Sequence, residues 1–193
     1  MCARMIDIIL ADIPDIKIIG LEKKTDARGY FIQKYSKRDF DEAGLHIDFV
    51  QDNESWNADS GTLRGLHFQT PDFAQTKLVS VITGSIFDVA VDIRNGSPTY
   101  GKHVSFTIKA DDCKQVLIPR GFAHGFYTLE PDTLVSYKVD AFYSATNEGG
   151  LLWNDPLLSI KWPTQGNQPI LSDRDRQWEG FNGFTSPFDT DNV

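Results

Sequence analysis

Cysteine is scarce in this sequence of 193 residues, and the two that it contains, Cys2 and Cys113, lie far apart. They form neither a disulfide framework nor a zinc-binding spacing, so we expect free thiols in a reducing compartment. A long apolar run is also lacking. The short N-terminal one is interrupted by Asp7 and Asp12, and no cleavage site of a signal peptide follows it. These absences predict a cytoplasmic protein that does not enter a membrane.

Clusters of basic residues are absent as well. Lys and Arg number 19 against 27 Asp and Glu, a formal net charge of -8, and the basic residues are scattered. Such a field repels a polyanion, so nucleic acid is not an expected partner. A small anionic ligand is compatible with it, because a few arginines act strongly at short range. The length and the 40% of apolar residues predict one globular domain over residues 1–193.

Short segments with strand character dominate the chain. They are Ile16–Leu21, Tyr30–Tyr35, Ile47–Asn53, Gly61–Gln69, Lys77–Thr83, Ser85–Arg94, Gly101–Ile108, Asp112–Ile118, Gly125–Leu129 and Thr133–Asp140. Gly, Pro, Asn and Asp separate them at short spacing, which predicts an all-β antiparallel sandwich or barrel with few short helices. One early helix is predicted in SKRDFDEAGL, where Ser36 can cap, Asp39 takes the capping-box position and Gly44 can end it.

Alternation within the strands indicates which side chains share a face. In FDVAVDIR, the face opposite to Asp88 comprises Phe87, Val89, Val91 and Ile93. In LVSYKVD, Tyr137 falls on the same face as two valines, so its ring is predicted to point into the barrel and Lys138 to point outward. The alternative is that Tyr137 is a core aromatic residue whose hydroxyl is hydrogen-bonded.

Several polar residues stand where metal-binding barrels carry their ligands. The spacing Pro-x-Gly-x-x-His in PRGFAHG, which ends at His124, resembles the second motif of cupin barrels. The first cupin motif reads His-x-His, then Glu, then Gly, and here the same frame holds His67, Gln69, Lys77 and Gly84. A lysine ammonium repels a divalent cation and offers no lone pair. We therefore predict a cupin-like barrel without a metal, against the alternative of a metal-dependent dioxygenase.

These residues suit proton transfer beside a carbonyl group. Removal of a proton from the carbon next to a ketone produces an enolate, whose oxygen needs a positive partner in a dry pocket. Lys77 and His124 could provide it. His67 is the candidate base, because histidine titrates near neutral pH, and its alternative is a hydrogen-bonded core histidine.

Motifs along nearly the whole chain resemble one family. They run in order from DARGYF through FVQDNES, GTLRGLHFQ, KLVSVITGSIFDVAVDIRNGSPTYGK, IPRGFAHGF, YKVDAFY and WNDPLLSIKWP to LSDRD, and they are similar to those of dTDP-4-dehydrorhamnose 3,5-epimerases. The resemblance implies a jelly-roll barrel, usually a homodimer with exchanged edge strands, that needs no cofactor. It implies inversion of carbons 3 and 5 of dTDP-4-dehydro-6-deoxy-D-glucose to give dTDP-4-dehydro-L-rhamnose, a step in dTDP-rhamnose biosynthesis.

The resemblance also implies roles for individual residues. His67 matches the base, Asp175 the carboxylate that orients it, and Tyr137 the acid on the opposite face of the sugar. Lys77 and His124 match groups around the substrate carbonyl and the sugar. The residues that match the nucleotide and diphosphate site are Arg28, Phe31, Gln51, Asn53, Arg64 and Tyr143, together with Gln33, where the family often has glutamate.

Some points stay open at this stage. Gln33 leaves the recognition of the base undecided, and strict alternation from His67 turns Arg64 outward unless Gly65 introduces a bulge. Similar enzymes that invert one carbon, or that use another 4-keto nucleotide sugar, have the same histidine and tyrosine. A mono-epimerase is therefore one alternative. A non-catalytic sugar-nucleotide-binding cupin is another, although it would predict the loss of His67 or Tyr137, and both are present.

Overall fold

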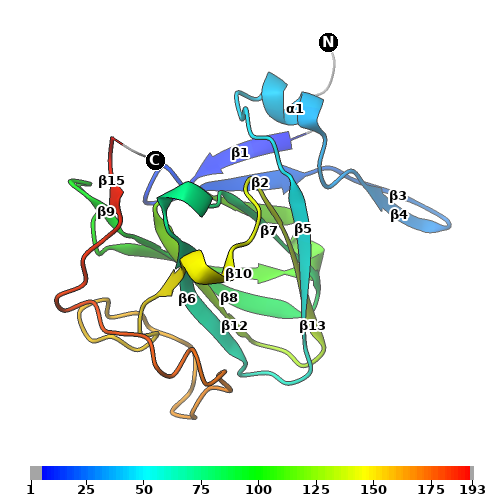
Figure 1. Cartoon of the computed structure of the whole chain (residues 1–193). Helices are drawn as coiled ribbons and strands as arrows, with labels where there is room; N and C mark the ends of the chain where they lie inside the picture. Colours follow the sequence, from blue (N-terminus) through cyan, green and yellow to red (C-terminus); the bar gives the residue numbers. More distant parts are fainter. Residues whose placement is uncertain (1–5, 192–193) are drawn as a thin grey trace.

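Two β-sheets packed face to face form the body of the protein (Figure 1). The computed structural model describes residues 6–191. The larger sheet contains, in spatial order, β1 (Ile6–Leu10), β2 (Lys17–Leu21), β11 (Lys114–Ile118), β7 (Lys77–Thr83), β13 (Thr133–Val139) and β5 (Gln51–Asn57). The smaller sheet contains β10 (His103–Lys109), β8 (Ser85–Asp92), β12 (Phe122–Thr128), β6 (Leu63–Gln69) and β14 (Glu148–Gly150). Neighbouring strands in both sheets are antiparallel, and the predicted all-β barrel is confirmed.

Shorter elements complete the fold. They are the hairpin of β3 (Lys23–Asp26) and β4 (Gly29–Ile32), the parallel pair of β9 (Arg94–Asn95) and β15 (Phe188–Asp189), helix α1 (Lys37–Glu42), and three 3₁₀ turns at Pro71–Phe73, Ala110–Asp112 and Ala145–Asn147. Between residues 151 and 187 the chain has no named helix or strand. We call this stretch the C-terminal segment.

Apolar residues bury both faces of the smaller sheet. The inner face packs against the larger sheet through Ile86, Ala90 and Phe126. The outer face, which includes Val89 and Val91, is covered by residues of the C-terminal segment. The predicted division of faces in β8 is thus present, but it does not separate core from solvent. Because the inner face holds Asp88 as well, this carboxylate points into the barrel.

One predicted strand, Ile47–Asn53, lies four residues later than expected. Ile47 and Phe49 are partly buried against the cluster around Phe40 instead of pairing in the sheet. The chain reaches the edge of the larger sheet only at Gln51, where β5 pairs with β13 along its whole length. An alternating apolar pattern does not distinguish a segment that pairs in a sheet from one that packs beside a helix, because both bury apolar side chains on one side.

Helix α1 forms where it was predicted. The amide nitrogen of Asp39 donates to the hydroxyl of Ser36, 3.4 Å away, and Gly44 follows the helix with φ of +82°. The carboxylate of Asp39 accepts a hydrogen bond from the amide of Gln33. In the described part of the chain, Cys113 is a free thiol as predicted, and Cys2 lies outside that part. None of the helices within residues 6–191 combines the length and apolar character needed to cross a bilayer.

Phe40 should be the residue that fixes α1 to the larger sheet. It is fully buried and meets Tyr35 and Phe49 edge to face, with ring centres 5.0 and 6.4 Å away. We expect Phe40→Ala to lower the free energy of unfolding by about 3–5 kcal/mol, from lost burial and the cavity it leaves. Phe73→Ala, at an exposed position, should change it by less than about 0.5 kcal/mol. Urea denaturation at one protein concentration measures both, and equal effects would contradict the prediction.

Candidate active site

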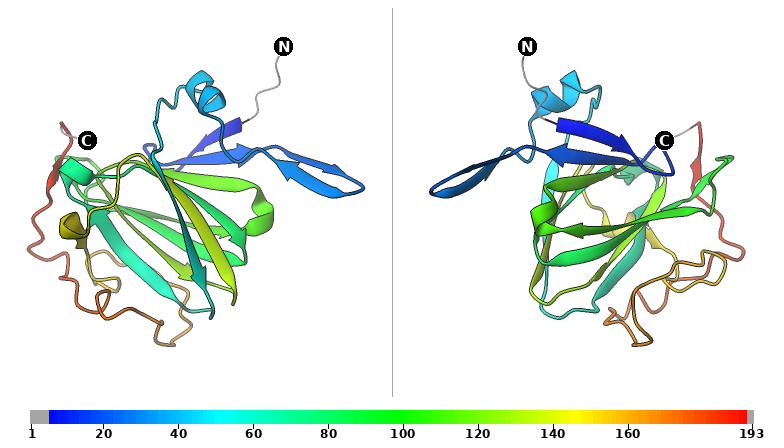
Figure 2. Two further views of the ribbon diagram at one scale, coloured as in Figure 1. Left: turned by 45° about the vertical axis from the view of Figure 1, so that its right-hand side comes forward. Right: turned by 180° about the vertical axis from the view of Figure 1, so that it is seen from behind.

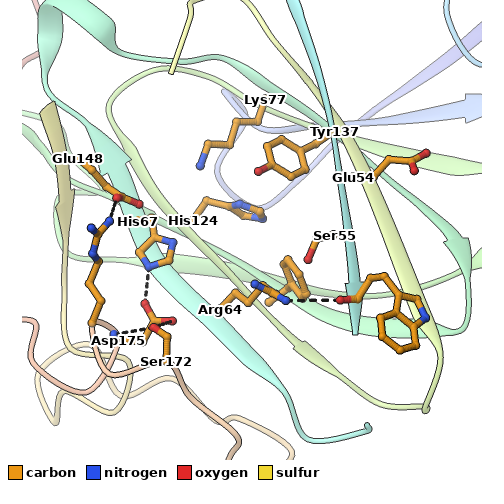
Figure 3. Close-up of a pocket in the computed structure, with 13 residues that line it drawn as sticks. Glu54, Ser55, Arg64, His67, Lys77, His124, Tyr137, Glu148, Ser172 and Asp175 are labelled. Carbon is orange, nitrogen blue, oxygen red and sulfur yellow. Dashed lines mark hydrogen bonds and ion pairs between the residues drawn. The ribbon is translucent and has the colours of Figure 1, made fainter. Parts of the chain in front are cut away.

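A pocket of about 680 Å³ opens between the two sheets (Figure 3). Six of the predicted site residues line it: Arg64, His67, Lys77, His124, Tyr137 and Asp175. The remaining lining residues, to which the sequence assigned no function, are Glu54, Ser55, Trp56, Phe126, Glu148, Ser172 and Arg174. All four predicted catalytic residues therefore share one cavity.

His67 stands on β6 and is bonded to a carboxylate from the C-terminal segment. Its Nε2 donates to Oδ1 of Asp175, whose side chain is 5% exposed. The hydroxyl of Ser172 donates to the other carboxylate oxygen over 2.9 Å and accepts from the Asp175 amide over 3.1 Å. With Nε2 occupied in this way, Nδ1 is the imidazole nitrogen left to take a substrate proton.

The environment keeps Asp175 ionised. Burial alone raises the pKa of its carboxyl, but the hydrogen bond and charge of His67 and the hydroxyl of Ser172 outweigh burial, so the pKa lies below its usual value. An ionised carboxylate in this place could stabilise an imidazolium on His67. A histidine and an ionised carboxylate in this arrangement can serve as a general base.

Tyr137 faces His67 from the other sheet. It lies on β13, and its ring points into the barrel, while Lys138 points outward and bonds to Asp52 over 2.5 Å, as the alternation predicts. Burial raises the pKa of the Tyr137 hydroxyl above its usual value, against the opposing effect of the Arg64 charge. The phenol consequently keeps its proton at neutral pH and is available as an acid.

Lys77 extends from β7 to the space between these two residues (Figure 3). Burial lowers the pKa of its ammonium group to about 8, while the carboxylates of Asp88 and Glu148 act in the opposite direction. Lys77 is therefore a cation at neutral pH in a site of reduced solvation. Such a charge interacts strongly with an oxyanion.

Asp88 on β8 is a site residue that the sequence analysis missed. It is fully buried, and its Oδ1 accepts from Nε2 of His124 over 2.7 Å. Its second oxygen has no hydrogen-bond partner among residues 6–191. A carboxylate in the middle of an apolar strand was the available signal, because a buried charge needs a cation nearby. Asp88 holds His124 and contributes negative charge beneath Lys77.

Arg64 reaches the pocket because β6 is irregular. The pairing with β12 shifts register between His124 and Phe126, which is the bulge that the outward alternation of Arg64 required. Gly65 has φ of +129°, and a Cβ there would lie 2.5 Å from the Cα of Gly125, so only glycine fits. Arg64 then donates from Nε to the side chain of Asn57 over 2.8 Å.

Arg174 and Glu148 were also missed. They form an ion pair at the pocket wall, and the Tyr143 hydroxyl donates to the same Glu148 oxygen over 3.0 Å. Tyr143 is thereby adjacent to the pocket. The backbone nitrogen of Tyr143 donates to Gln51 over 3.1 Å, and Gln51 donates to Asn53 over 2.8 Å. The only sequence signal for Arg174 was its place next to Asp175 in LSDRD.

Three predicted nucleotide-site residues lie elsewhere. Arg28 and Phe31 belong to the hairpin of β3 and β4, which projects from the barrel (Figure 2). Arg28 pairs with Asp26 over 2.5 Å, and Phe31 is 64% exposed. Gln33 bonds to Asp39 of helix α1. None of the three lines the pocket of their own chain.

Two positions that carry metal ligands in metal-binding cupins are occupied here by Gln69 and Lys77. Gln69 donates to the carbonyl of Phe73 over 3.3 Å and accepts from the amide of Ser144 over 2.7 Å, so it braces the backbone. Lys77 takes the place of the carboxylate. Within the described residues, no three histidine, cysteine or carboxylate side chains gather in a way that could hold a metal ion.

Comparison with known proteins places this site in a family. The model for dTDP-4-dehydrorhamnose 3,5-epimerase matches residues 11–183. The chain belongs to this epimerase family. The dTDP-4-dehydrorhamnose 3,5-epimerase of Sinorhizobium fredii is 48% identical over 163 residues, which are 84% of this chain and 83% of that protein.

Solved structures agree with this membership. The epimerase of Legionella pneumophila in complex with dTDP-4-keto-L-rhamnose is 40% identical, with a TM-score of 0.88 over 93% of this chain and 95% of that one. A 3'-monoepimerase from Streptomyces bikiniensis in complex with dTDP-quinovose is 28% identical, with a TM-score of 0.82 over 89% and 86% of the two chains. The fold and the epimerase activity are thus common to this chain and its relatives.

The charge of Lys77 should set the alkaline limit of activity. Because its pKa is about 8, the ammonium loses its proton as the pH rises through this value, and kcat/KM should fall there. Lys77→Met should reduce kcat about 100- to 1,000-fold, as for loss of an oxyanion donor. Lys77→Arg is the matched control. Because a guanidinium stays charged, the fall of kcat/KM should move to higher pH in this variant. If the fall occurs at the same pH as in the wild type, a group other than Lys77 causes it.

Proposed function

We propose that this epimerase inverts carbons 3 and 5 of dTDP-4-dehydro-6-deoxy-D-glucose and so produces dTDP-4-dehydro-L-rhamnose. The observation that carries the proposal is the position of base and acid on opposite sheets. His67 is on the smaller sheet and Tyr137 on the larger one, with Lys77 and His124 between them in Figure 3. A sugar ring between the two sheets would present one face to each.

The chemistry follows from this arrangement. His67 takes the proton from the carbon beside the 4-keto group, the C–H electrons form the carbon–carbon double bond of the enolate, and the carbonyl π electrons move to the oxygen. Lys77 and His124 stabilise this enolate oxygen, while Asp175 stabilises the imidazolium. Tyr137 then protonates the same carbon from the other face, which inverts it. Carbons 3 and 5 both adjoin the ketone, so one set of residues can act on each in turn once His67 has released its proton to solvent and Tyr137 has regained one. No electrons are gained or lost overall.

Sequence identity to the relatives favours two inversions over one. The relative from Sinorhizobium fredii, named a 3,5-epimerase, is 48% identical, whereas the 3'-monoepimerase is 28% identical. The number of inverted carbons can be measured with a reductase that accepts only the doubly inverted product.

The cytoplasm is the compartment that we propose, because Cys113 is a free thiol and suits a reducing environment.

We also propose that the active unit is a homodimer in which the β3–β4 hairpin of one copy completes the pocket of the other. The hairpin exposes Tyr30 by 65% and Phe31 by 64%, and an isolated two-stranded hairpin is only marginally stable in water. Exposed aromatic side chains of this kind mark contact surfaces. Arg28 at its turn supplies a cation that suits a diphosphate. The outer edge of β1 is also unpaired among the described residues, and a second copy can cover such an edge.

Isotope exchange separates the two proton-transfer residues. His67→Asn should abolish turnover and also deuterium uptake at carbons 3 and 5 in heavy water. Tyr137→Phe should still exchange deuterium on the original face but invert poorly, and each loss should be about 100- to 10,000-fold in turnover. Tyr127→Phe is the control, because Tyr127 is a buried tyrosine that does not line this pocket. If Tyr137→Phe inverts the sugar at nearly the wild-type rate, Tyr137 is a core aromatic residue and not the acid.

Complementation tests the shared pocket. Arg28→Ala and His67→Asn chains with different tags are co-expressed, and the mixed dimer is isolated. If the hairpin serves the partner's pocket, one pocket of the mixed dimer is intact and the other lacks both groups. Its turnover should be about half that of the wild type, although each parent dimer is impaired. A mixed dimer without activity would contradict the proposal, and so would a protein that is monomeric at micromolar concentration in light scattering.

A further inference from the structure

Trp178 packs against the His67–Asp175 pair from the C-terminal segment. It follows Asp175 by three residues, and its ring centre lies 6.1 Å from that of His67, with 66° between the ring planes. The indole nitrogen is buried and forms no hydrogen bond to the described residues, but its N–H dipole is close enough to Asp175 to lower the pKa of that carboxyl. Trp178 does not line the pocket, and no step of the proposed chemistry uses it.

The neighbouring strand leaves room for this indole. Gly150 of β14 pairs with His67 of β6, so the two residues lie side by side on the smaller sheet. A Cβ at position 150 would lie 2.6 Å from the indole nitrogen of Trp178, far inside van der Waals contact. The glycine therefore allows Trp178 to sit beside His67.

We infer that Trp178 is a positioning residue for the base: its ring packs against the His67 imidazole and fixes its plane, and its indole N–H favours the ionised form of the nearby Asp175 carboxylate. The inference rests on the proposed functions of His67 and Asp175. Asp175 belongs to a segment without regular structure, and such segments are more mobile than strands. A base must keep its geometry closely to remain productive. Ser172 and His67 hold the two carboxylate oxygens, and the packing of the indole against His67 restrains the imidazole itself.

The charges around Asp175 make the indole's contribution measurable. His67 on β6 and Arg174 on the C-terminal segment face this carboxylate, and Glu148 on β14 is ion-paired with Arg174. The pKa of Asp175 is raised by burial and lowered overall by its donors, among which is the Trp178 N–H. Loss of this donor raises the pKa, so Asp175 takes up a proton at a higher pH when the solution is acidified. The interaction of the ionised Asp175 carboxylate with His67 is then lost at a higher pH than in the wild type.

Two substitutions separate the contribution of the aromatic ring of Trp178 from that of its N–H group. Trp178→Phe keeps an aromatic ring and removes the N–H, so the acidic limb of kcat should move to higher pH, with only a small loss at neutral pH. Trp178→Ala removes both and should lower kcat by roughly 10- to 100-fold with little change in KM, because the pocket wall is intact. Trp153→Phe is the control, since this tryptophan of the same segment does not line the pocket, and its kcat and pH profile should match the wild type.

Gly150→Ala tests the contact without altering Trp178. The added methyl group displaces the indole from His67, so the kinetic effect should resemble that of Trp178→Ala. Fluorescence gives a second measurement, because an imidazole in contact with an indole can quench its emission. The emission lost on Trp178→Phe should therefore be larger in a His67→Asn background than in the wild-type background.

Each outcome decides a separate question. Wild-type kcat and pH profile in Trp178→Ala, with an inactive His67→Asn protein, would make Trp178 a packing residue and leave the proposed function standing. If the alanine protein does not fold, Trp178 emission that is unchanged by His67→Asn would overturn the inference. Turnover by His67→Asn would instead contradict the proposed function itself.

Discussion

The hydrogen bond between His67 and Asp175 joins the two parts of this fold. It links β6 of the barrel to the C-terminal segment, 108 residues further along the chain. A buried carboxylate without a partner is costly, so Asp175 is stable in its place only while the imidazole faces it. The ionised carboxylate, in turn, helps to hold the imidazole in one orientation. Docking of the C-terminal segment, which also rests on apolar contacts with the smaller sheet, therefore contributes to the orientation of His67.

The barrel and the inward position of Tyr137 could be predicted because strands have a strict period of two. Val135 and Val139 on either side of Tyr137 are fully buried, and they impose their face on the tyrosine between them. A different signal, the spacing of the cupin motifs, placed Lys77 and His124 in one cavity. Arg64 is the exception that the sequence could name in advance, since Gly65 permits the bulge that turns it inward.

Other features depend on information that a local pattern does not contain. Alternation in β8 separated two faces, but it could not show that the C-terminal segment covers one of them and leaves Asp88 inside the barrel. That segment has neither helical nor strand periodicity, so the contact of Trp178 with His67 left no signal in the sequence. Arg28 and Phe31 match the family pattern, yet a single chain places them on a projecting hairpin. A motif identifies candidate residues of a site, but it does not show where the fold of one chain places them.

The pocket shows how an acidic protein can stabilise a developing negative charge. Burial lowers the pKa of Lys77 to about 8, and this weakens its hold on the proton. The same loss of solvent strengthens the attraction of the ammonium for an enolate oxygen. Asp88 and Glu148 oppose the effect of burial on Lys77, and Asp88 does so from beneath the pocket floor, bonded to His124. The carboxylates thus keep the lysine protonated, while its charge stays directed toward the space that the sugar would occupy.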